Sequence, residues 1–324
     1  MLWEEPMRQD TSHSALVYST AQKASAAVTS PVAASWSRCL NLYRLAPEEA
    51  RKPVQVDDIA FREAHRRMER LIGSSTDEVD RLYQMIGRSG CCIILADADG
   101  IVVDRRGAPG DDTEFRSLGL WQQNVWSEAS VGTNGIGTAL VDERSVVIHR
   151  DQHFMSANIG LSCATAPIRD HLGRVMAALD VSTCRNDVND MTLAVLSQAV
   201  KDAAARVETN LFRQAFPGAR IVVVPQANSI SALIAVDSDD LILGATKAAR
   251  VALKLDDQLI SQGMPAADVL REARGDGGSD LDDAERAALR RVLSRTQGNV
   301  SQAAQILGIS RATLHRKLKR FQAQ

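Results

Sequence analysis

The sequence predicts an α+β protein, in which a domain with an antiparallel sheet is followed by an all-helical C-terminal segment. Short apolar runs bounded by turn residues recur between residues 91 and 181, a pattern typical of buried strands. Longer stretches on both sides repeat apolar residues every three or four positions, which is the spacing of an amphipathic helix. An ordinary domain has about 100–200 residues, so we expect several folded units in 324 residues.

Positive charge is concentrated at the C-terminus. The formal net charge of the whole chain is −2, yet residues 286–324 contain nine Lys and Arg side chains and no acidic one. Residues 1–285 therefore carry a net charge of −11. A basic segment at the end of an acidic chain is the distribution expected when only that segment contacts nucleic acid.

The composition argues against several other classes of protein. An apolar content of 45% with 24% charged residues is typical of a globular protein rather than a disordered or fibrous one. The longest apolar run, residues 91–96, is too short to span a membrane, and the N-terminus has no signal-peptide pattern. The five cysteines are scattered without a CxxC pair, which favours reduced thiols over disulfides or zinc. We therefore expect a cytoplasmic protein without a membrane partner.

The first predicted elements are helices, followed by a hairpin. Residues 1–30 are rich in Ser, Thr and Ala without clear periodicity, and we expect them to be loosely ordered. Residues 31–72 have a helical pattern. Residues 91–96 then predict a buried strand, the Asp-Gly pair at 99–100 suits a tight turn, and residues 101–103 predict the returning strand.

Three more strands and a long helix are predicted downstream. The strands cover residues 146–148, 164–168 and 175–181, and a polar turn joins the last two. The helix covers residues 191–212, and its apolar positions step alternately by three and four residues, as in a heptad seam. Because this seam is long enough to pair with its copy in a second subunit, it predicts a homodimer. Strands and short helices recur on a smaller scale in residues 219–255.

Three short helices are predicted after a glycine-rich linker at residues 274–278. The first begins at the capping-box-like pair Ser279 and Asp282. The second covers residues 300–307 and ends at Gly308, a residue suited to a left-handed turn. The third follows directly and carries most of the basic side chains. Two short helices joined by Gly-Ile-Ser favour a DNA-binding helix-turn-helix over the alternative of a solvated basic helix.

The third helix of this motif is expected to enter the major groove of DNA. Arg side chains can donate two hydrogen bonds to guanine, while hydroxyl groups and backbone N–H groups at a helix start reach phosphates. Residues 298–320, GNVSQAAQILGISRATLHRKLKR, resemble the Fis family of helix-turn-helix domains. The predicted DNA-binding residues are Asn299, Ser301, Ser310, Arg311, Thr313, His315, Arg316, Lys317, Lys319 and Arg320.

A second resemblance covers about two thirds of the chain. The motifs VWSEAS at 125–130, GTNGIGT at 132–138, DQHF at 151–154 and LDVS at 179–182 resemble the GAF sensor domain of acetoin-catabolism-type regulators. SWSRC at 35–39 resembles the segment that precedes GAF in that family. The resemblance implies a GAF-like sensor domain that binds a small-molecule effector.

The effector site is predicted from the rare Trp side chains beside the most distinctive motif. Binding pockets combine apolar walls with a few polar groups that orient the ligand. The alternative for the two Trp residues is a place in the core, because cores use the same apolar side chains. The predicted effector-binding residues are Trp121, Trp126, Asn134, Ile136, His153 and Cys163.

Members of this family often carry a central AAA+ ATPase that drives sigma-54, and the sequence departs from that pattern. It contains no GxxxxGK[ST] motif, and residues 244–247, GATK, are the nearest approach. We therefore expect neither ATP-driven activation nor a cofactor. The glycines of residues 132–137 do not form a dinucleotide fingerprint, because Leu140 stands where the third glycine would be needed.

A group of His, Asp and Cys residues between positions 149 and 163 offers metal binding or catalysis as alternative functions. His149, Asp151, His153 and Cys163 could form a metal cluster, but His149 is expected to end a strand rather than to share a helix face with His153. Cys163 could be a redox sensor or a nucleophile, but a buried thiol is the commoner fate. No GxSxG elbow or acid–base pair supports catalysis. We expect no enzyme activity, no catalytic residue and no metal site.

The predicted function is sequence-specific transcriptional regulation. The GAF-like domain would sense an effector without ATP, and the partners would be operator DNA, the effector, a second subunit and, as a candidate, RNA polymerase. The alternative is a constitutive DNA-binding protein whose GAF domain is only a dimerisation scaffold. The predicted regions are an N-terminal helical region (1–77), a GAF-like sensor domain (78–190), a connecting and dimerisation helix (191–216), a candidate degenerate PAS-like region with linker (217–274) and a Fis-type helix-turn-helix domain (279–324).

Overall fold

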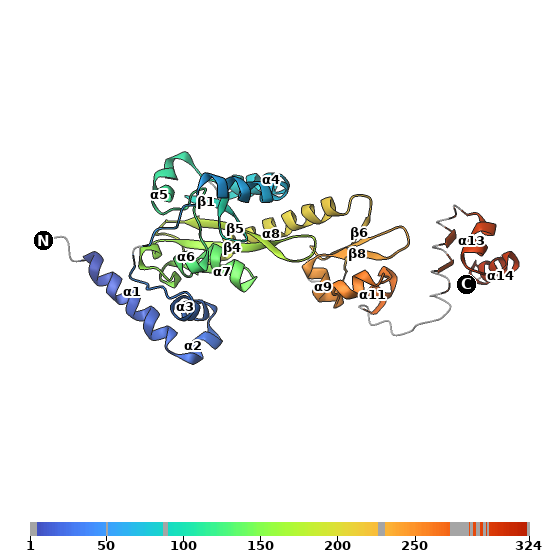
Figure 1. Ribbon diagram of the computed structural model, residues 1–324, viewed down its shortest axis with the longest axis horizontal. Coiled ribbons are helices and arrows are strands. Elements are labelled where there is room, and N and C mark those ends of the chain that lie inside the picture. The colour runs from blue at the N-terminus through green and yellow to red at the C-terminus, as the bar shows by residue number, and fades with distance from the viewer. Residues whose placement is uncertain are drawn as a thin grey trace. The chain divides into compact units, whose positions relative to one another are not determined.

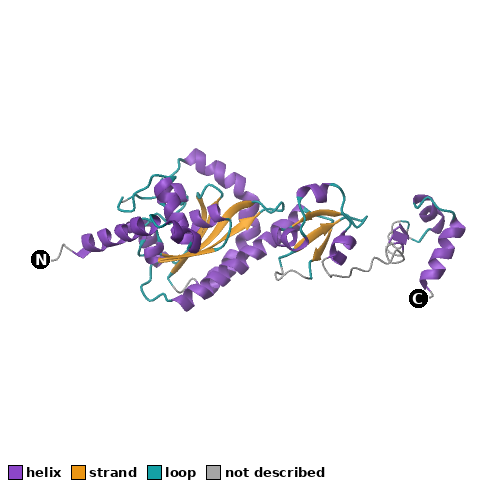
Figure 2. Cartoon of the chain, turned by 90° about the horizontal axis from the view of Figure 1, so that it is seen from below, coloured by secondary structure: helices purple, strands orange, loops and turns teal. Residues whose placement is uncertain are grey.

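A five-stranded antiparallel sheet forms the centre of the N-terminal part of the chain (Figure 2). The strand order is β2-β1-β5-β4-β3, so the first strand pairs with the last. This sheet confirms the strands that the apolar runs predicted. Its members are β1 (Cys91–Asp97), β2 (Val102–Arg106), β3 (Val146–His149), β4 (Ser162–Arg169) and β5 (Val175–Thr183).

The chain divides into two units, residues 1–214 and 215–324. The computed structural model describes residues 5–49, 51–86, 90–225, 231–272, 285, 288–289, 292–293, 296 and 298–322. The predicted linker at 274–278 and the predicted capping pair Ser279 and Asp282 lie outside these residues. Every helix in the described part of the chain is too short or too polar to cross a lipid bilayer.

Helices cover both faces of the sheet (Figure 1). Strand side chains alternate between the two faces, which explains why β1 is buried along its whole length. One face packs against α4 (Asp58–Ile86) and α8 (Asp190–Ala215) in the larger apolar core. The other face packs against α6 (Glu128–Val131), α7 (Gly135–Asp142) and Phe115 of α5 (Asp112–Ser117).

The apolar seam of α8 is buried within its own chain. Leu196, Val200 and Val207 are at most 5% exposed and pack in the same core as β1, β5 and α4. The prediction that this seam pairs with a second subunit is therefore wrong for these side chains. A spacing of three and four residues marks an apolar helix face, but a sheet of the same chain covers such a face as well as a second helix does.

Helices also form where the sequence suggested loose order. Residues 5–29 contain α1 (Glu5–Ala21) and α2 (Ala24–Thr29), which corrects the expectation for residues 1–30. Val17 of α1 is fully buried beside Trp36 of α3 (Pro31–Asn41). His13 is 5% exposed, and its Nδ1 lies 3.0 Å from Ser156 Oγ. This helix lacks an apolar period because part of its buried face is polar and hydrogen-bonded.

A smaller sheet lies in the second unit. It contains β6 (Arg220–Val223), β7 (Leu233–Val236) and β8 (Ile242–Ala245) in that order, all antiparallel. Its apolar side chains share a core with residues of the helices that follow it. The PAS-like character of this region stays a prediction. The helices that follow this smaller sheet are α9 (Lys247–Leu253), α10 (Asp257–Ser261) and α11 (Ala266–Glu272).

Candidate functional site

The C-terminal helices form a helix-turn-helix on a core of their own. α13 (Val300–Ile306) and α14 (Arg311–Gln322) are joined by a turn in which Gly308 has a φ of 64°. The N–H groups of Gly308 and Ile309 donate to Gln305 O and Ala304 O, the two hydrogen bonds of a Schellman cap. Only glycine adopts this left-handed conformation without strain, so the local sequence fixes the angle between the helices.

Small and apolar side chains let these helices pack closely. Ala303 and Ala304 of α13 and Leu314 of α14 are at most 4% exposed and share a core with Leu289 and Val292. The small alanines permit the second helix to cross close to the first.

Polar side chains cap both helices of the motif. Asn299 Oδ1 accepts the N–H of Gln302 at 3.2 Å, at the start of α13. Ser310 Oγ accepts the N–H of Thr313 at 3.1 Å, at the start of α14. Ser310 Oγ also lies 2.9 Å from Thr313 Oγ1. These three predicted DNA-binding residues therefore also order the helix starts.

The predicted basic residues of α14 differ in their surroundings. Arg311, His315, Arg316 and Lys319 are exposed, and Ser301 of α13 is exposed as well. Lys317 instead forms an ion pair with Glu285 inside the domain. The side chain of Arg320 lies outside the described residues. The exposed cations leave one face of α14 available to a polyanion.

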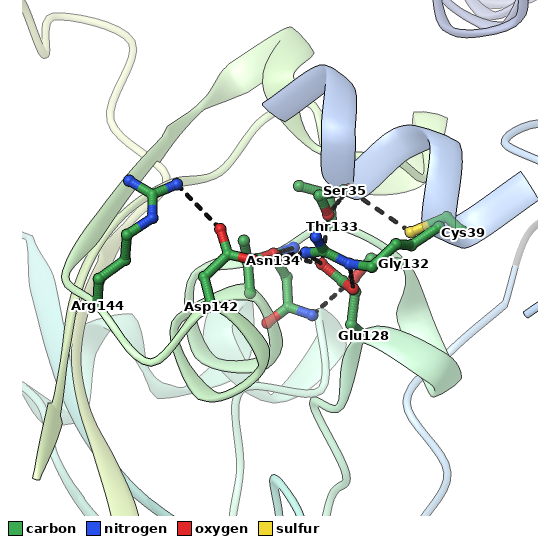
Figure 3. Close-up of polar contacts among 10 residues, drawn as sticks. Ser35, Cys39, Glu128, Gly132, Thr133, Asn134, Asp142 and Arg144 are labelled. Carbon is green, nitrogen blue, oxygen red and sulfur yellow. Dashed lines mark hydrogen bonds and ion pairs between the residues drawn. The ribbon is translucent and has the colours of Figure 1, made fainter. Parts of the chain in front are cut away.

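In the first unit, a buried carboxylate joins the N-terminal helices to the sheet domain (Figure 3). The side chain of Glu128 is 0% exposed. Arg38 of α3 donates to it twice, from Nε to Oε2 at 2.8 Å and from Nη2 to Oε1 at 3.0 Å. Arg38 Nη2 also donates to Asp142 Oδ1 at 2.8 Å. The hydrogen bonds to Glu128 raise the pKa of Arg38, so the guanidinium stays charged.

Hydroxyl groups complete the shell of Glu128. Ser35 Oγ and Thr138 Oγ1 both donate to Glu128 Oε1, the latter at 3.1 Å. Thr133 Oγ1 lies 2.6 Å from Ser35 Oγ, and Cys39 Sγ lies 3.6 Å from Thr133 Oγ1. Burial raises the pKa of the Cys39 thiol to about 12. The motifs SWSRC and SEASVGTNGIGT, far apart in the sequence, thus meet at one carboxylate.

The glycines of the second motif permit close packing. A Cβ atom at Gly135 would lie 2.3 Å from Thr165 Oγ1 and 2.7 Å from Asp180 Oδ1. A Cβ atom at Gly137 would lie 2.3 Å from the backbone nitrogen of Glu128. α7 therefore approaches both the sheet and α6 as closely as only glycine allows.

A second buried polar chain lies between α7 and the sheet. Asp180 accepts from Thr165 Oγ1 at 2.5 Å and from Ser182 Oγ at 2.6 Å. Burial raises the pKa of Asp180 to about 6, against the opposing effect of these two hydrogen bonds. Ser182 Oγ also lies 3.0 Å from Cys163 Sγ, which lies 3.5 Å from His153 Nε2.

His153 is held as a neutral ring. Its Nδ1 lies 3.0 Å from Arg150 O, so Nδ1 carries the proton, and Nε2 accepts from the Cys163 thiol. Burial lowers the pKa of His153 to about 4 and raises that of Cys163 well above its usual value. A neutral thiol beside a neutral imidazole lacks the thiolate that nucleophilic or redox chemistry needs. Among the described residues, no three His, Cys, Asp or Glu side chains form a possible metal site.

The remaining predicted effector residues have packing partners. Trp126 is 1% exposed, and its Nε1 donates to Gly119 O at 2.8 Å. Asn134 caps α7, because its Oδ1 accepts from Gly137 N at 2.9 Å. Ile136 belongs to the apolar core between the sheet and helices α6 and α7. Trp121 is half-buried, and the guanidinium groups of Arg105 and Arg116 lie over its ring, with their Cζ atoms 4.3 and 3.8 Å from the ring centroid. Their role in effector binding stays a prediction.

Sequence reasoning gave no role to the side chains that hold the polar network together. Ser35, Arg38 and Glu128 stood inside motifs that were noted only for their resemblance. A signal was present, since Arg38 and Glu128 each stand in a stretch of otherwise uncharged residues. Without the fold, however, nothing joined positions 93 and 90 residues apart.

Comparison with known proteins gives the family. Residues 9–210 match the model of the MimR N-terminal domain. The chain belongs to this family. Residues 280–321 match the bacterial regulatory protein model of the Fis family, which confirms the predicted helix-turn-helix type. No GxxxxGK[ST] motif occurs in residues 211–279, between the two matched segments, and no AAA+ model matches.

Two relatives of the chain are transcription regulators by name. It is 29% identical over 225 residues to the acetoin catabolism regulatory protein of Cupriavidus necator, covering 68% of this chain and 34% of that protein. It is 31% identical over 190 residues to the propane 2-monooxygenase operon transcriptional activator MimR of Mycolicibacterium smegmatis, covering 57% and 30%. The chain thus spans about a third of the length of these relatives.

A solved structure has a fold similar to that of about three quarters of the chain. The N-terminal part of Escherichia coli DhaR, in its complex with DhaL, superposes with a TM-score of 0.51 at 18% identity. The match covers 76% of this chain and 85% of that one. It supports the GAF-like fold class that the sequence predicted.

Replacing Glu128 by Gln is expected to lower the free energy of unfolding by about 3–5 kcal/mol, because it removes the buried carboxylate that accepts two hydrogen bonds from Arg38 and leaves only Asp142 as its counter-charge. Glu63→Gln is the matched control. Glu63 accepts from Nε and Nη2 of Arg66 in the same fork geometry, but on an exposed helix surface. That pair should contribute little to stability, because water screens it. Urea unfolding of both variants measures the difference, and equal losses would contradict the structural role of Glu128.

Asp180 and His153 are expected to change stability in opposite directions between pH 6.5 and 4. The raised pKa of Asp180 means that the folded state binds its proton more tightly, so this contribution is present near pH 4 and is lost as the pH rises through about 6. The lowered pKa of His153 means that the unfolded chain binds its proton more tightly, so stability is lost as the pH falls from 6.5 toward 4.

Single substitutions should separate these two effects, each on the order of 3 kcal/mol at full extent. Asp180→Asn should lose stability more steeply than the parent as the pH falls from 6.5 to 4, and His153→Gln less steeply. Urea unfolding at half-unit pH steps gives the slopes. Parallel curves for the parent chain and Asp180→Asn would show that the Asp180 carboxyl does not titrate differently in the folded state.

Proposed function

We propose that the chain is a sequence-specific DNA-binding transcription regulator whose GAF-like domain binds a small-molecule effector. The observation that carries this proposal is the presence, in one chain, of the MimR N-terminal domain and a Fis-type helix-turn-helix with an exposed basic face on α14. The named relatives are regulators of catabolic operons, which supports a small metabolite as the signal. We further propose that regulation needs no ATP hydrolysis, because the sequence has no phosphate-binding loop.

The proposed domain division follows the sequence. Residues 1–77 and 78–190 form the helical region and the GAF-like sensor, 191–216 the connecting helix, 217–274 the PAS-like region and linker, and 279–324 the DNA-binding domain. A homodimer remains part of the proposal, and its two helix-turn-helix motifs would read half-sites about 34–36 Å apart on an imperfect palindrome. Since the α8 seam is buried, a different surface has to form the dimer contact.

The second candidate function is constitutive DNA binding, with the GAF-like domain as a scaffold. The observation in its favour is that Trp126, Asn134 and His153 are buried and hydrogen-bonded within the domain. The two candidates differ in whether any metabolite changes stability or DNA binding.

A screen of small catabolic metabolites by thermal unfolding should distinguish them. An effector present at 100 times its dissociation constant should stabilise the folded chain by about 2.7 kcal/mol. The same compound should change the affinity of the chain for its operator, mapped first by sequencing bound genomic fragments. Stabilisation by no compound, with operator binding unaffected throughout, would favour the scaffold.

Exposed side chains of α14 are expected to divide into base-reading and phosphate-binding groups. Arg316→Ala and Arg311→Ala should cost roughly 1–3 kcal/mol on the operator and relax specificity at one position. Lys319→Ala should weaken binding to all sequences alike and reduce the salt slope by about 1. Lys317→Ala is the control for a cation already paired with Glu285, and should change the slope less.

Salt titrations on operator and random DNA measure these effects. Equal losses on both DNAs for all four variants would show that α14 does not read bases.

A further inference from the structure

One arginine in the sheet domain is buried without a full set of partners. Arg105 of β2 pairs across the sheet with Ile94, and Ile94 pairs on its other side with Asp180. These cross-strand neighbours point to the same face, the one covered by α7 and Phe115. The Arg105 side chain is 8% exposed. A guanidinium is always charged, so burying it is costly unless its N–H groups find acceptors.

Only one end of this guanidinium is hydrogen-bonded. Arg105 Nη1 donates to Asp112 Oδ1 at 2.7 Å. Nε and Nη2 are both buried and have no acceptor among the described residues. No other arginine in the described part of the chain leaves both of these nitrogens buried without a partner.

These two nitrogens form one edge of the guanidinium fork, and the chain uses that edge elsewhere to hold carboxylates. Arg38 donates from Nε and Nη2 to the two oxygens of Glu128, and Arg185 donates from the same pair to Asp187 at 2.9 and 2.8 Å. The planar fork matches the two oxygens of a carboxylate. A planar group with two acceptor oxygens is therefore the partner best suited to accept hydrogen bonds from Nε and Nη2 of Arg105.

Aromatic rings and a glycine surround this group. The Cζ atom of Arg105 lies 4.3 Å from the centroid of the Trp121 ring and 5.5 Å from that of Phe115. A Cβ atom at Gly107 would come within 2.6 Å of Nη2 and 3.0 Å of Cζ. Any side chain at position 107 would therefore displace the fork. The Cζ atom of Arg116 also lies over the Trp121 ring, 3.8 Å from its centroid. The surroundings therefore supply aromatic contacts and a second cation, but no second acid pairs with Arg105 among the described residues.

We infer that the Nε–Nη2 edge of Arg105 binds the carboxylate of a small effector, whose apolar body lies against Phe115 and Trp121. This inference rests on the proposed sensor function and names the chemical class of the effector. It also gives Trp121 a role, as a wall beside the charged group. A Lys at position 105 would keep the charge but could not donate two parallel hydrogen bonds.

The test uses the full chain and matched probe pairs: benzoate with benzamide, butyrate with butyramide, and pyruvate with pyruvamide. Calorimetry and thermal unfolding measure binding. At least one acid is expected to bind, with its amide at least 10-fold weaker. Arg105→Gln and Arg105→Lys should each lose at least 10-fold in affinity for the acid.

Two further variants keep the result interpretable. Arg106→Gln changes the next residue of β2, whose side chain pairs with Asp80 on the other face of the sheet, and should bind the acid like the parent chain. Gly107→Ala keeps the charge of Arg105 but shifts the fork, and should also weaken binding. Operator binding and circular dichroism check that each variant is folded.

The outcomes separate this inference from the proposed function. If no acid binds, if amides bind as well as acids, or if Arg105→Gln keeps the affinity, the carboxylate site is overturned. A neutral metabolite that binds parent and Arg105→Gln equally, and still changes operator affinity, would overturn it while leaving the sensor function standing. If neither these probes nor the metabolite screen gives any binding, the sensor function itself fails.

Discussion

A fully buried carboxylate is the constraint on which the N-terminal unit depends. Glu128 has no access to water, so its charge is tolerable only while Arg38, Ser35 and Thr138 donate to it together. Ser35 and Arg38 belong to α3 and Thr138 to α7, so the requirement of one charge fixes a helix from the start of the chain against the sheet domain. Apolar contacts around Trp36 and Phe154 add area to this junction, but they do not specify its position as hydrogen bonds do.

The strands and the helix-turn-helix could be predicted because their signals are local. A run such as residues 91–96 has to be buried on both faces wherever it lies, and Gly308 with Ser310 determines a turn and a cap within four positions. The partner of an apolar helix face is not local information. The seam of α8 was therefore assigned to a second subunit, although the chain's own sheet covers it. The sequence did not predict α1 for a related reason. Its buried face includes His13, which hydrogen-bonds to Ser156, so the helix has no continuous apolar period.

The sensor site was harder to predict, because rarity of a residue type does not reveal its neighbours. Trp126 was predicted to bind the effector because tryptophan is rare in this chain. Its Nε1 instead donates to a backbone carbonyl seven residues away, and its ring lies in the core. Arg105 gave no such signal, since it stands between the charged residues Asp104 and Arg106 in a sequence with many arginines. What sets Arg105 apart is the absence of acceptors for two of its nitrogens among the described residues, and that depends on contacts with Asp112 and Trp121 that only the fold creates.

The pairing of β1 with β5 has a consequence for how the chain acquires its structure during synthesis. β1 leaves the ribosome early, but the residues of β5 with which it pairs lie 80–92 positions downstream. Ser156, the partner of His13, lies 143 residues after it. At about 5–20 residues per second, α1 emerges on the order of 10 s before the residues that bury it. Non-local pairing of this kind also slows folding after release. α1 and α3 therefore lack the contacts that bury them throughout that interval, although they are made before the sheet domain.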